Sequence, residues 1–237
     1  DYNAKYEAAI KYYDEKKYFK AHELFESIQP IYRGTDKDEP INYYLAQCYF
    51  YDDDYVVSAY YFKTFVNTFP NSDKVEECRY KTGYCFYMSS PKSSLDQDYA
   101  KKAIEEFQAY LNKYSTGKQV DNCKTYIAEL RKKLEKKAYA NAKLYFDMRQ
   151  YKAATYAFRN FLNDYPDSDF REESLYFLLK SGFLMAENSV EKKKFDRYES
   201  VISDYYSYID EYPSGEFVKE AEKCFSKSQE YITKVAQ

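Results

Sequence analysis

The strongest constraint on the fold of this chain is a nine-residue motif that occurs twice. Residues 65–73 read FVNTFPNSD and residues 161–169 read FLNDYPDSD. In both, apolar residues spaced as on one face of a helix lead into an aromatic residue and a proline. Because a proline ring cannot continue the helical hydrogen-bond ladder, each motif predicts the end of a helix. A structural unit that ends in this way therefore recurs along the chain.

Counting backwards from such helix ends gives five units of two helices each. The first helix of a unit carries a small residue followed three places later by an aromatic residue or methionine, and the second helix carries a further small residue and a further aromatic residue. The members are Ala9, Tyr12, Ala21 and Phe25; Ala46, Tyr49, Ser58 and Phe62; Gly83, Phe86, Ala103 and Phe107; Ala142, Tyr145, Ala154 and Phe158; and Gly182, Met185 and Tyr205. A small residue lets the partner helix approach closely. The side chains predicted to be buried between paired helices include Ala46, Tyr49, Phe62, Ala142, Tyr145 and Phe158.

This helix–turn–helix unit resembles the tetratricopeptide repeat. One helix pair cannot bury its apolar faces alone, so the pairs are expected to stack. The resemblance implies an all-α fold, a right-handed α-α superhelix (solenoid) of five tetratricopeptide-like repeats plus a C-terminal helix at residues 215–236. The whole chain, 1–237, is then a single solenoid, with repeats 1–3 in residues 1–115 and repeats 4–5 and the C-terminal helix in residues 116–237. The first helix of repeat 4 is predicted to run from about 118 to 147, roughly 45 Å at ~1.5 Å per residue.

The residues after the prolines predict how the next helices begin. Asp73 with Glu76, and Asp169 with Glu172, form a D-x-x-E pattern that we interpret as a capping box. Each motif would then combine the end of one helix with the start of another.

Composition argues against nucleic-acid binding and against membrane-spanning segments. The net charge is −3, which leaves no surplus of basic residues to bind nucleic-acid phosphates. The mean hydropathy is −0.83 and no long apolar run occurs, so no segment is expected to span a bilayer. The lysine-rich segments at 131–137 and 191–194 are interpreted as a solvated helix face and a helix–helix turn, not as binding patches.

No catalytic, metal or cofactor site is expected. The only histidine, His22, is interpreted as a surface or packed residue, and no Ser-His-Asp set, phosphate loop or HExxH motif occurs. The acidic run 52–54 lacks the glycine and final glutamate of a calcium loop. The scattered cysteines form no CxxC pair and are predicted to be buried free thiols. They are Cys48, Cys78, Cys85, Cys123 and Cys224. The competing class is an enzyme with a diffuse carboxylate site.

A stripe of aromatic residues is the candidate binding surface. In tetratricopeptide superhelices, positions 2, 5, 9 and 12 of each unit face a concave groove. Position 5 holds Tyr6, Tyr43, Tyr80 and Tyr139, with Leu179 in the fifth unit; position 12 holds Tyr13, Phe50, Tyr87 and Phe146; position 9 adds Tyr84. These rings form either a second internal seam or a groove for an extended peptide, and both interpretations stay open. Our hypothesis is that the groove receives an aromatic-rich peptide at Tyr6, Tyr13, Tyr43, Phe50, Tyr80, Tyr84 and Tyr87.

Several segments together carry a resemblance to a more specific family. They are YFKTFVNTFPNSD (61–73), SPKSSLDQD (90–98), KAIEEFQAYLNKY (102–114), AKLYFDMRQYKAA (142–154) and the closing run at 191–223. The insertion with Leu95, Asp96 and Gln97 and the DRY segment at 196–198 are the more specific parts. With these segments in this order, the chain resembles the BamD family, the tetratricopeptide lipoproteins of the outer-membrane β-barrel assembly machine, in the form found in Bacteroidetes-like bacteria.

The resemblance implies a periplasmic protein at the outer membrane, anchored through a lipidated cysteine that is expected upstream of Asp1. It also implies binding to the POTRA domains of BamA, to other lipoproteins of the machine, and to unfolded outer-membrane protein precursors, which typically end in an aromatic residue. In the family, the N-terminal repeats are linked to the precursors and the C-terminal repeats to BamA. The alternatives are another periplasmic tetratricopeptide adaptor, such as a Tol-Pal coordinator, and a cytosolic peptide-binding scaffold.

Overall fold

The computed structural model describes residues 1–236, and within that range all regular structure is helical. The helices are α1 (Tyr2–Asp14), α2 (Tyr18–Tyr32), α3 (Asp38–Tyr51), α4 (Tyr55–Thr68), α5 (Val75–Ser89), α6 (Asp98–Lys113), α7 (Val120–Asp147), α8 (Tyr151–Asp164), α9 (Arg171–Glu187), α10 (Glu191–Glu211) and α11 (Val218–Val235). The predicted all-α arrangement, five helix pairs and a C-terminal helix, is confirmed. Across the described part of the chain, no helix combines the length and apolar character needed to cross a membrane.

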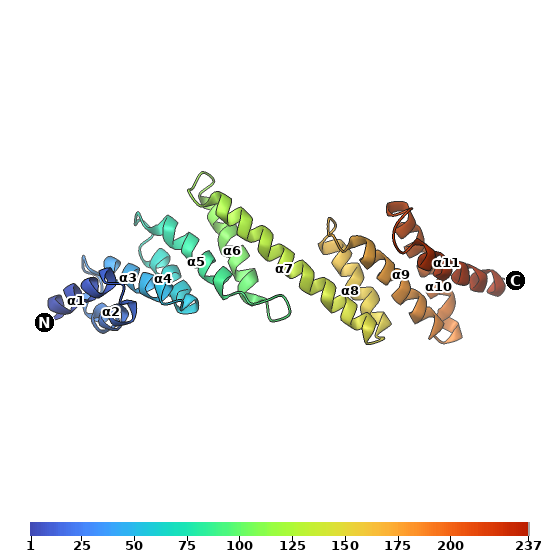
Figure 1. Cartoon of the computed structure of the whole chain (residues 1–237), viewed down its shortest axis with the longest axis horizontal. Coiled ribbons are helices and arrows are strands. Elements are labelled where there is room, and N and C mark those ends of the chain that lie inside the picture. Colours follow the sequence, from blue (N-terminus) through green and yellow to red (C-terminus); the bar gives the residue numbers. More distant parts are fainter. Residues whose placement is uncertain (237) are drawn as a thin grey trace. The chain divides into compact units, whose positions relative to one another are not determined.

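The chain divides into two compact units, Asp1–Leu134 and Glu135–Gln237. In unit 1, α1–α6 form three successive pairs, and the first half of α7 packs against α6. In unit 2, the second half of α7 pairs with α8 and α9 pairs with α10, while α11 packs on both α9 and α10 (Figure 1). The long first helix predicted for repeat 4 is confirmed as α7, so the boundary between the units lies inside a helix.

Small residues bring the paired helices together, as predicted. Ser58 on α4 is fully buried and its hydroxyl donates to the carbonyl of Ala46 on α3 at 2.9 Å. At Gly83 on α5, an added Cβ would lie 2.8 Å from the ring of Phe107 on α6. Such contacts leave no room for a larger side chain, so the small residues set the distance between the helices.

Four of the six side chains predicted to be buried are fully buried: Ala46, Phe62, Ala142 and Phe158. Tyr49 is half-buried, because its ring stacks on His22 of the preceding pair at 4.5 Å while its hydroxyl reaches Glu26. The prediction for Tyr145 is wrong, since it is 41% exposed. The α7–α8 pair is the first of unit 2, so no preceding pair of that unit covers this ring.

The helix ends confirm one prediction and correct another. α4, α8 and α10 each end two residues before a proline, at Pro70, Pro166 and Pro213. The capping boxes are wrong, because α5 and α9 begin at Val75 and Arg171, beyond the aspartates that were to cap them.

The serine of each motif holds the turn instead. Ser72 accepts a hydrogen bond from the N–H of Lys74 (3.2 Å), and Ser168 accepts one from the N–H of Phe170 (3.0 Å). Each serine hydroxyl also donates to a glutamate of the preceding first helix: Ser72 to Glu39 at 2.6 Å, and Ser168 to Glu135. We call this glutamate, with its hydroxyl donor from the second helix or following turn, the carboxylate anchor.

Two anchors use a tyrosine hydroxyl where the turn has glycine. Tyr110 on α6 donates to Glu76 at 2.7 Å, and Tyr208 on α10 donates to Glu172 at 2.9 Å. A Cβ on Gly117 would lie 2.5 Å from the Tyr110 hydroxyl, and one on Gly215 would lie 2.7 Å from that of Tyr208. Glycine is therefore required by the space that the tyrosine hydroxyl occupies.

The anchors correct the register of the last repeat. Glu172 occupies the place of Glu39, Glu76 and Glu135, so position 5 of this repeat is Tyr176 and not Leu179. Leu179 is fully buried in the core. The prediction counted from the small residue Gly182, but α10 is 21 residues long, against 14 for α8, and it crosses α9 one turn later than the other pairs cross.

The lysine-rich segments are only partly as predicted. Residues 191–194 form the first turn of α10, not a loop, and Lys194 pairs with Glu191 at 2.6 Å. Within 131–137, Arg131, Lys132 and Lys136 are exposed on α7, but Lys133 donates to the hydroxyl of Ser90 at 2.9 Å and so ties α7 to the loop between α5 and α6.

Candidate protein-binding site

The predicted stripe lies on the first helices of unit 1, and each of its seven rings is half-buried. Tyr6 and Tyr13 lie on α1, Tyr43 and Phe50 on α3, and Tyr80, Tyr84 and Tyr87 on α5. We call the surface formed by α1, α3 and α5 the first-helix face of unit 1. Every stripe ring thus has one part in the core and one part open to solvent.

The structure joins the rings at one end of the stripe into a continuous ladder. Phe50 lies 6.0 Å from Tyr84, and Tyr84 lies 6.0 Å from both Tyr80 and Tyr87. Tyr13 joins this ladder through Tyr51, which lies 5.5 Å from Phe50 and 6.4 Å from Tyr13.

The inner edges of the stripe rest on second-helix rings. Tyr6 contacts Phe25 at 6.3 Å, Tyr43 contacts Phe65 at 5.9 Å, and Tyr80 contacts Phe107 at 6.2 Å. These supporting rings are themselves fully buried. The stripe is therefore fixed in orientation by the core and does not consist of loose surface rings.

Hydrogen bonds hold the hydroxyl ends of two stripe tyrosines. The Tyr43 hydroxyl donates to both oxygens of Glu77 at 3.2 and 3.1 Å, and the Tyr87 hydroxyl donates to Glu129 at 2.5 Å. Burial and then the nearby Glu77 raise the pKa of Tyr43, while the hydrogen bond to Glu129 and then burial raise the pKa of Tyr87 to about 12. Both hydroxyls stay protonated at neutral pH, so they give the stripe polarity without charge.

A polar network crosses from α3 to α5 beside the ladder. Glu77 accepts from Gln47 at 3.1 Å and pairs with Lys81 at 3.0 Å, and Lys81 donates to Gln47 at 2.7 Å. Burial acts to raise the pKa of Glu77, but the hydrogen bonds and the charge of Lys81 outweigh it and lower the pKa. The Lys81 ammonium lies 4.8 Å from the centroid of Phe50. This network fixes the relative position of two stripe helices.

Sequence reasoning missed three contributors to this face. They are Tyr51, Tyr126 and Lys81. Tyr126 on α7 lies 4.4 Å from Tyr87 and 5.6 Å from Tyr84, and so extends the ladder onto a fourth helix. Tyr51 directly follows a stripe residue in sequence, which is a usable signal. The other two are recognisable only once the helices are placed side by side.

A recess opens next to the stripe. A cavity of about 300 Å³ is lined by Tyr80, Tyr110, Lys118, Gln119 and the carboxylates of Asp73, Glu76 and Glu77. It combines ring faces with acidic groups at the turn end of α5. The first-helix face of unit 1 therefore offers a hollow as well as a row of rings.

Position 5 of unit 2 has the same tyrosine but a different neighbour. In unit 1, Lys37 lies 4.6 Å from the ring of Tyr6, and Lys74 lies 5.1 Å from the ring of Tyr43. In unit 2, Phe170 stacks on Tyr139 at 4.4 Å, and Phe217 stacks on Tyr176 at 4.5 Å. A lysine thus lies over two position-5 rings of unit 1, whereas a phenylalanine covers each one in unit 2.

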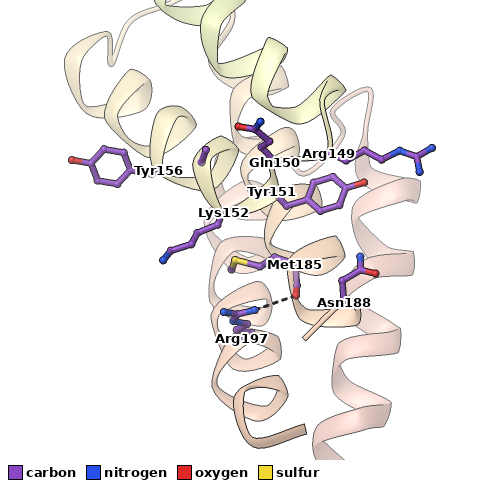
Figure 2. Close-up of a pocket in the computed structure, with 9 residues that line it drawn as sticks. Arg149, Gln150, Tyr151, Lys152, Tyr156, Met185, Asn188 and Arg197 are labelled. Carbon is purple, nitrogen blue, oxygen red and sulfur yellow. Dashed lines mark hydrogen bonds between the residues drawn. The ribbon is translucent and has the colours of Figure 1, made fainter. Parts of the chain in front are cut away.

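A larger cavity lies on unit 2, around the turns that join α7 to α8 and α9 to α10. It measures about 680 Å³ and is lined by Arg149, Gln150, Tyr151, Lys152, Ala153, Tyr156, Met185, Asn188 and Arg197. Figure 2 shows Arg197 beside the end of α9, where its guanidinium donates to the carbonyl of Met185 at 3.4 Å. The sequence did not predict this surface, which combines three cations with two tyrosine rings.

The neighbouring cavity contains a half-buried acid. It measures about 340 Å³, and Asp204 on α10 lines it together with Arg159 and Arg197. Burial raises the pKa of Asp204 to about 6, although the Arg159 guanidinium at 3.5 Å acts in the opposite direction. This carboxyl is the only described acid among the lining residues of these two cavities.

No catalytic constellation is found among residues 1–236. No group of three or more histidine, cysteine, aspartate or glutamate side chains in that range could hold a metal ion. His22 is packed between rings, and its Nε2 lies 3.9 Å from Asp52. All five cysteines are buried free thiols, and burial raises the pKa of Cys48, Cys78 and Cys85 to about 12.

Comparison with known proteins gives a family match. The family model YfiO, described as an outer membrane lipoprotein, matches residues 1–198. No curated protein matches the chain significantly.

Solved tetratricopeptide structures are also similar. The structure described as "TPR2AB-domain:pHSP90-complex of yeast Sti1" has a TM-score of 0.42 at 15% identity, covering 96% of this chain and 98% of that one. The structure described as "Crystal Structure of P58(IPK) TPR Domain at 2.5 A" has a TM-score of 0.46 at 14% identity, covering 100% of this chain and 66% of that one.

Proposed function

Because this chain belongs to the YfiO family of outer membrane lipoproteins, we propose that it is a non-catalytic scaffold of the outer-membrane β-barrel assembly machine. Membership in the family indicates association with the outer membrane. In the proposal, the protein lies on the periplasmic face of the outer membrane and is held there by a lipid anchor. Its partners are the POTRA domains of BamA, other lipoproteins of the machine, and unfolded outer-membrane protein precursors.

The observation that carries this proposal is the ladder of half-buried rings on unit 1. Each stripe ring leaves part of its surface open, and buried rings such as Phe25, Phe65 and Phe107 hold its orientation. A row of oriented rings suits an extended peptide with apolar and aromatic side chains. The predicted client residues are those of the stripe: Tyr6, Tyr13, Tyr43, Phe50, Tyr80, Tyr84 and Tyr87.

The chemistry of the stripe suits a protein that passes its client on. A ring-on-ring contact adds about 0.5–1.5 kcal/mol beyond the burial of area. A few such contacts give modest affinity once the cost of ordering the peptide is subtracted. Because the tyrosine hydroxyls are neutral, client binding should depend weakly on salt.

Unit 2 is the proposed docking half for BamA. Its outer cavity combines the cations Arg149, Lys152 and Arg197 with the exposed ring of Tyr156, which is 71% exposed. A large, partly apolar hollow with few acidic groups fits a folded partner that presents carboxylates.

The client half is tested with a peptide from the end of a barrel precursor. The triple variant Tyr43→Ala, Tyr80→Ala, Tyr84→Ala should lose peptide binding in its folded fraction, and its melting temperature should fall because each removed ring packs partly on the core. The matched control is Tyr60→Ala with Tyr156→Ala. It removes two rings that do not belong to the stripe and are 66% and 71% exposed. A large fall in stability, with peptide binding retained by the folded fraction, would show that the stripe belongs to the core.

The docking half is tested with the purified POTRA domains of BamA. The variant Arg149→Glu, Lys152→Glu should weaken POTRA binding by tenfold or more and leave the peptide titration unchanged. Lys192→Glu with Lys193→Glu makes the same change of charge at exposed positions on α10 and serves as control. Peptide binding by a wild-type protein that does not bind POTRA domains would favour another periplasmic adaptor, such as a Tol-Pal coordinator.

A further inference from the structure

The corrected register brings out a row of lysines on unit 2. Position 9, four residues after the position-5 tyrosine, is Lys143 on α7 and Lys180 on α9. On α11, which begins at Val218 as α9 begins at Arg171, the equivalent residue is Lys227. In unit 1 the same position holds Ile10, Gln47 and Tyr84. The helices α7, α9 and α11 of unit 2 thus each carry a lysine at position 9, whereas α1, α3 and α5 of unit 1 do not.

The contacts of these lysines place them on a common surface. The Lys143 ammonium lies 4.5 Å from the ring centroid of Phe177 on α9, and the Lys227 ammonium lies 5.8 Å from Phe183 on the same helix. Lys180 lies 5.8 Å from Phe183, and its ammonium is 3.8 Å from the sulfur of Cys224 on α11. The row therefore runs from α7 across α9 to α11, with phenylalanine rings between the ammonium groups. We call it the lysine row.

Two lysines of the row form no ion pair with a described carboxylate. Lys143 pairs with Asp147 at 2.7 Å, but no described carboxylate forms an ion pair with Lys180 or Lys227. Lys180 is half-buried and Lys227 is exposed. An unpaired ammonium that rests on a ring is partly desolvated, which strengthens its attraction for an anion that can reach it.

We propose that the lysine row binds an acidic, extended polypeptide segment. Packed helices lie about 8–10 Å apart, and an extended chain in the polyproline II conformation advances ~3.1 Å per residue with three residues per turn, so side chains three residues apart lie on one face. Lysines on successive helices therefore match carboxylates about three residues apart, as in Glu-x-x-Glu-x-x-Glu. The phenylalanine rings between the ammonium groups contact the intervening apolar side chains.

An extended peptide fits this surface better than a membrane does. The side chain of Lys143 is only 30% exposed and Lys180 is half-buried, so two of the three ammonium groups do not protrude from the surface. A flat anionic bilayer reaches clustered, protruding cations, whereas a narrow chain can follow a row. This site goes beyond the proposed function, because neither the aromatic stripe nor the outer cavity contributes a residue to it.

The test uses the full chain and a labelled nine-residue peptide with glutamate at its first, fourth and seventh positions, followed by fluorescence anisotropy at low salt. We expect Lys180→Gln with Lys227→Gln to weaken binding about tenfold. Lys192→Gln with Lys193→Gln removes the same charge from α10 and should leave binding unchanged. The glutamine version of the peptide should bind about as weakly as the double variant does, and raised salt should weaken the glutamate peptide.

Three outcomes overturn the proposal. One is equal binding of the glutamate peptide by the wild type and by the lysine-row variant. Another is equal binding of a peptide whose three glutamates are adjacent, which would remove the spacing argument. The third is row-dependent binding to phosphatidylglycerol vesicles without any binding to the peptide. If Lys180→Gln lowers the melting temperature, the test uses the single variant Lys227→Gln at the exposed position. This variant should weaken binding of the glutamate peptide about threefold. The barrel-terminal peptide, titrated in parallel, reports separately on the proposed function.

Discussion

The two units share one framework and differ in the face that their first helices present. Unit 1 carries neutral or apolar residues at position 9, Ile10, Gln47 and Tyr84, and continues as a ladder of rings. Unit 2 carries lysines at that position and covers its position-5 tyrosines with phenylalanine. The repeat therefore fixes where side chains stand, while single positions decide which ligand chemistry each unit offers.

The framework itself is the same in both units. Each unit has one carboxylate anchor with a serine, at Ser72 and Ser168, and one with a tyrosine and a glycine. The core rings also correspond, since Phe62 and Phe158 are both fully buried between paired helices. Differences between the units should therefore appear in ligand binding and pH response, and not in the cost of removing equivalent core residues.

The largest expected effect tests this equality. Phe62→Ala in unit 1 and Phe158→Ala in unit 2 should each lower the free energy of unfolding by about 3–5 kcal/mol, because each leaves a cavity in the core. Denaturant unfolding followed by circular dichroism measures both. Losses that differ by more than about 2 kcal/mol would break the comparison, and they would show that one unit depends less on its core.

The next effect separates the units by pH, through Asp204 of unit 2. Its pKa is raised from 3.8 to about 6 in the folded protein, so the folded state binds this proton more tightly than the unfolded state. Below about pH 3.8 the carboxyl is protonated in both states, so its raised pKa costs no stability. Above pH 6 the raised pKa lowers the free energy of unfolding by about 3 kcal/mol. Asp204→Asn should therefore stabilise the protein by up to that amount at pH 7.5 and have little effect at pH 4.

The measurement is the difference in unfolding free energy between Asp204→Asn and the wild type across pH 4–7.5. Arg159→Gln serves as control, because it removes the nearby cation and should make the wild-type penalty larger. A constant difference at all pH values would contradict the assignment of this pH response to Asp204.

A smaller effect concerns the carboxylate anchors. In Gly215→Ala the new Cβ would lie 2.2 Å from Glu172 Oε1, which accepts from both the Tyr208 hydroxyl and the N–H of Glu216. Displacing this carboxylate should cost about 2 kcal/mol, since bonds to a charged acceptor contribute about 1.5–3 kcal/mol. Gly117→Ala in unit 1 should cost a similar amount, and thermal unfolding measures both. Wild-type melting temperatures for both variants would show that the anchors do not stabilise the turns.

The sequence predicted the framework because its signals are local. Helical periodicity, the small residues and the prolines are all set within one unit, so the pairs and the long α7 were predicted correctly. The caps were wrong because Ser72 and Ser168 offer both a donor and an acceptor to the turn, whereas Asp73 and Asp169 each lie one residue before the N-cap positions, Lys74 and Phe170. A local pattern did not reveal which of two neighbouring polar residues holds the turn.

The parts of the surface that were missed depend on contacts between helices. Tyr126 joins the stripe only because the start of α7 packs beside α5, which no spacing in the sequence encodes. The lysine row was hidden by the register of the last repeat. With Leu179 taken as position 5, Lys180 falls outside the binding positions, and only the Glu172 anchor restores its place. The positions of the seven stripe residues on the first helices were predictable from the sequence, whereas their ligand stays a prediction.

The most direct test of the account is a crossed titration of the two first-helix faces. The barrel-terminal aromatic peptide and the glutamate peptide are each titrated against the stripe variant (Tyr43→Ala, Tyr80→Ala, Tyr84→Ala) and the lysine-row variant (Lys180→Gln, Lys227→Gln). We predict that each variant loses about tenfold in affinity for one peptide and keeps its affinity for the other, and that only the glutamate peptide responds strongly to salt. If both variants weaken both peptides equally, the two faces do not differ in ligand chemistry and the account is wrong.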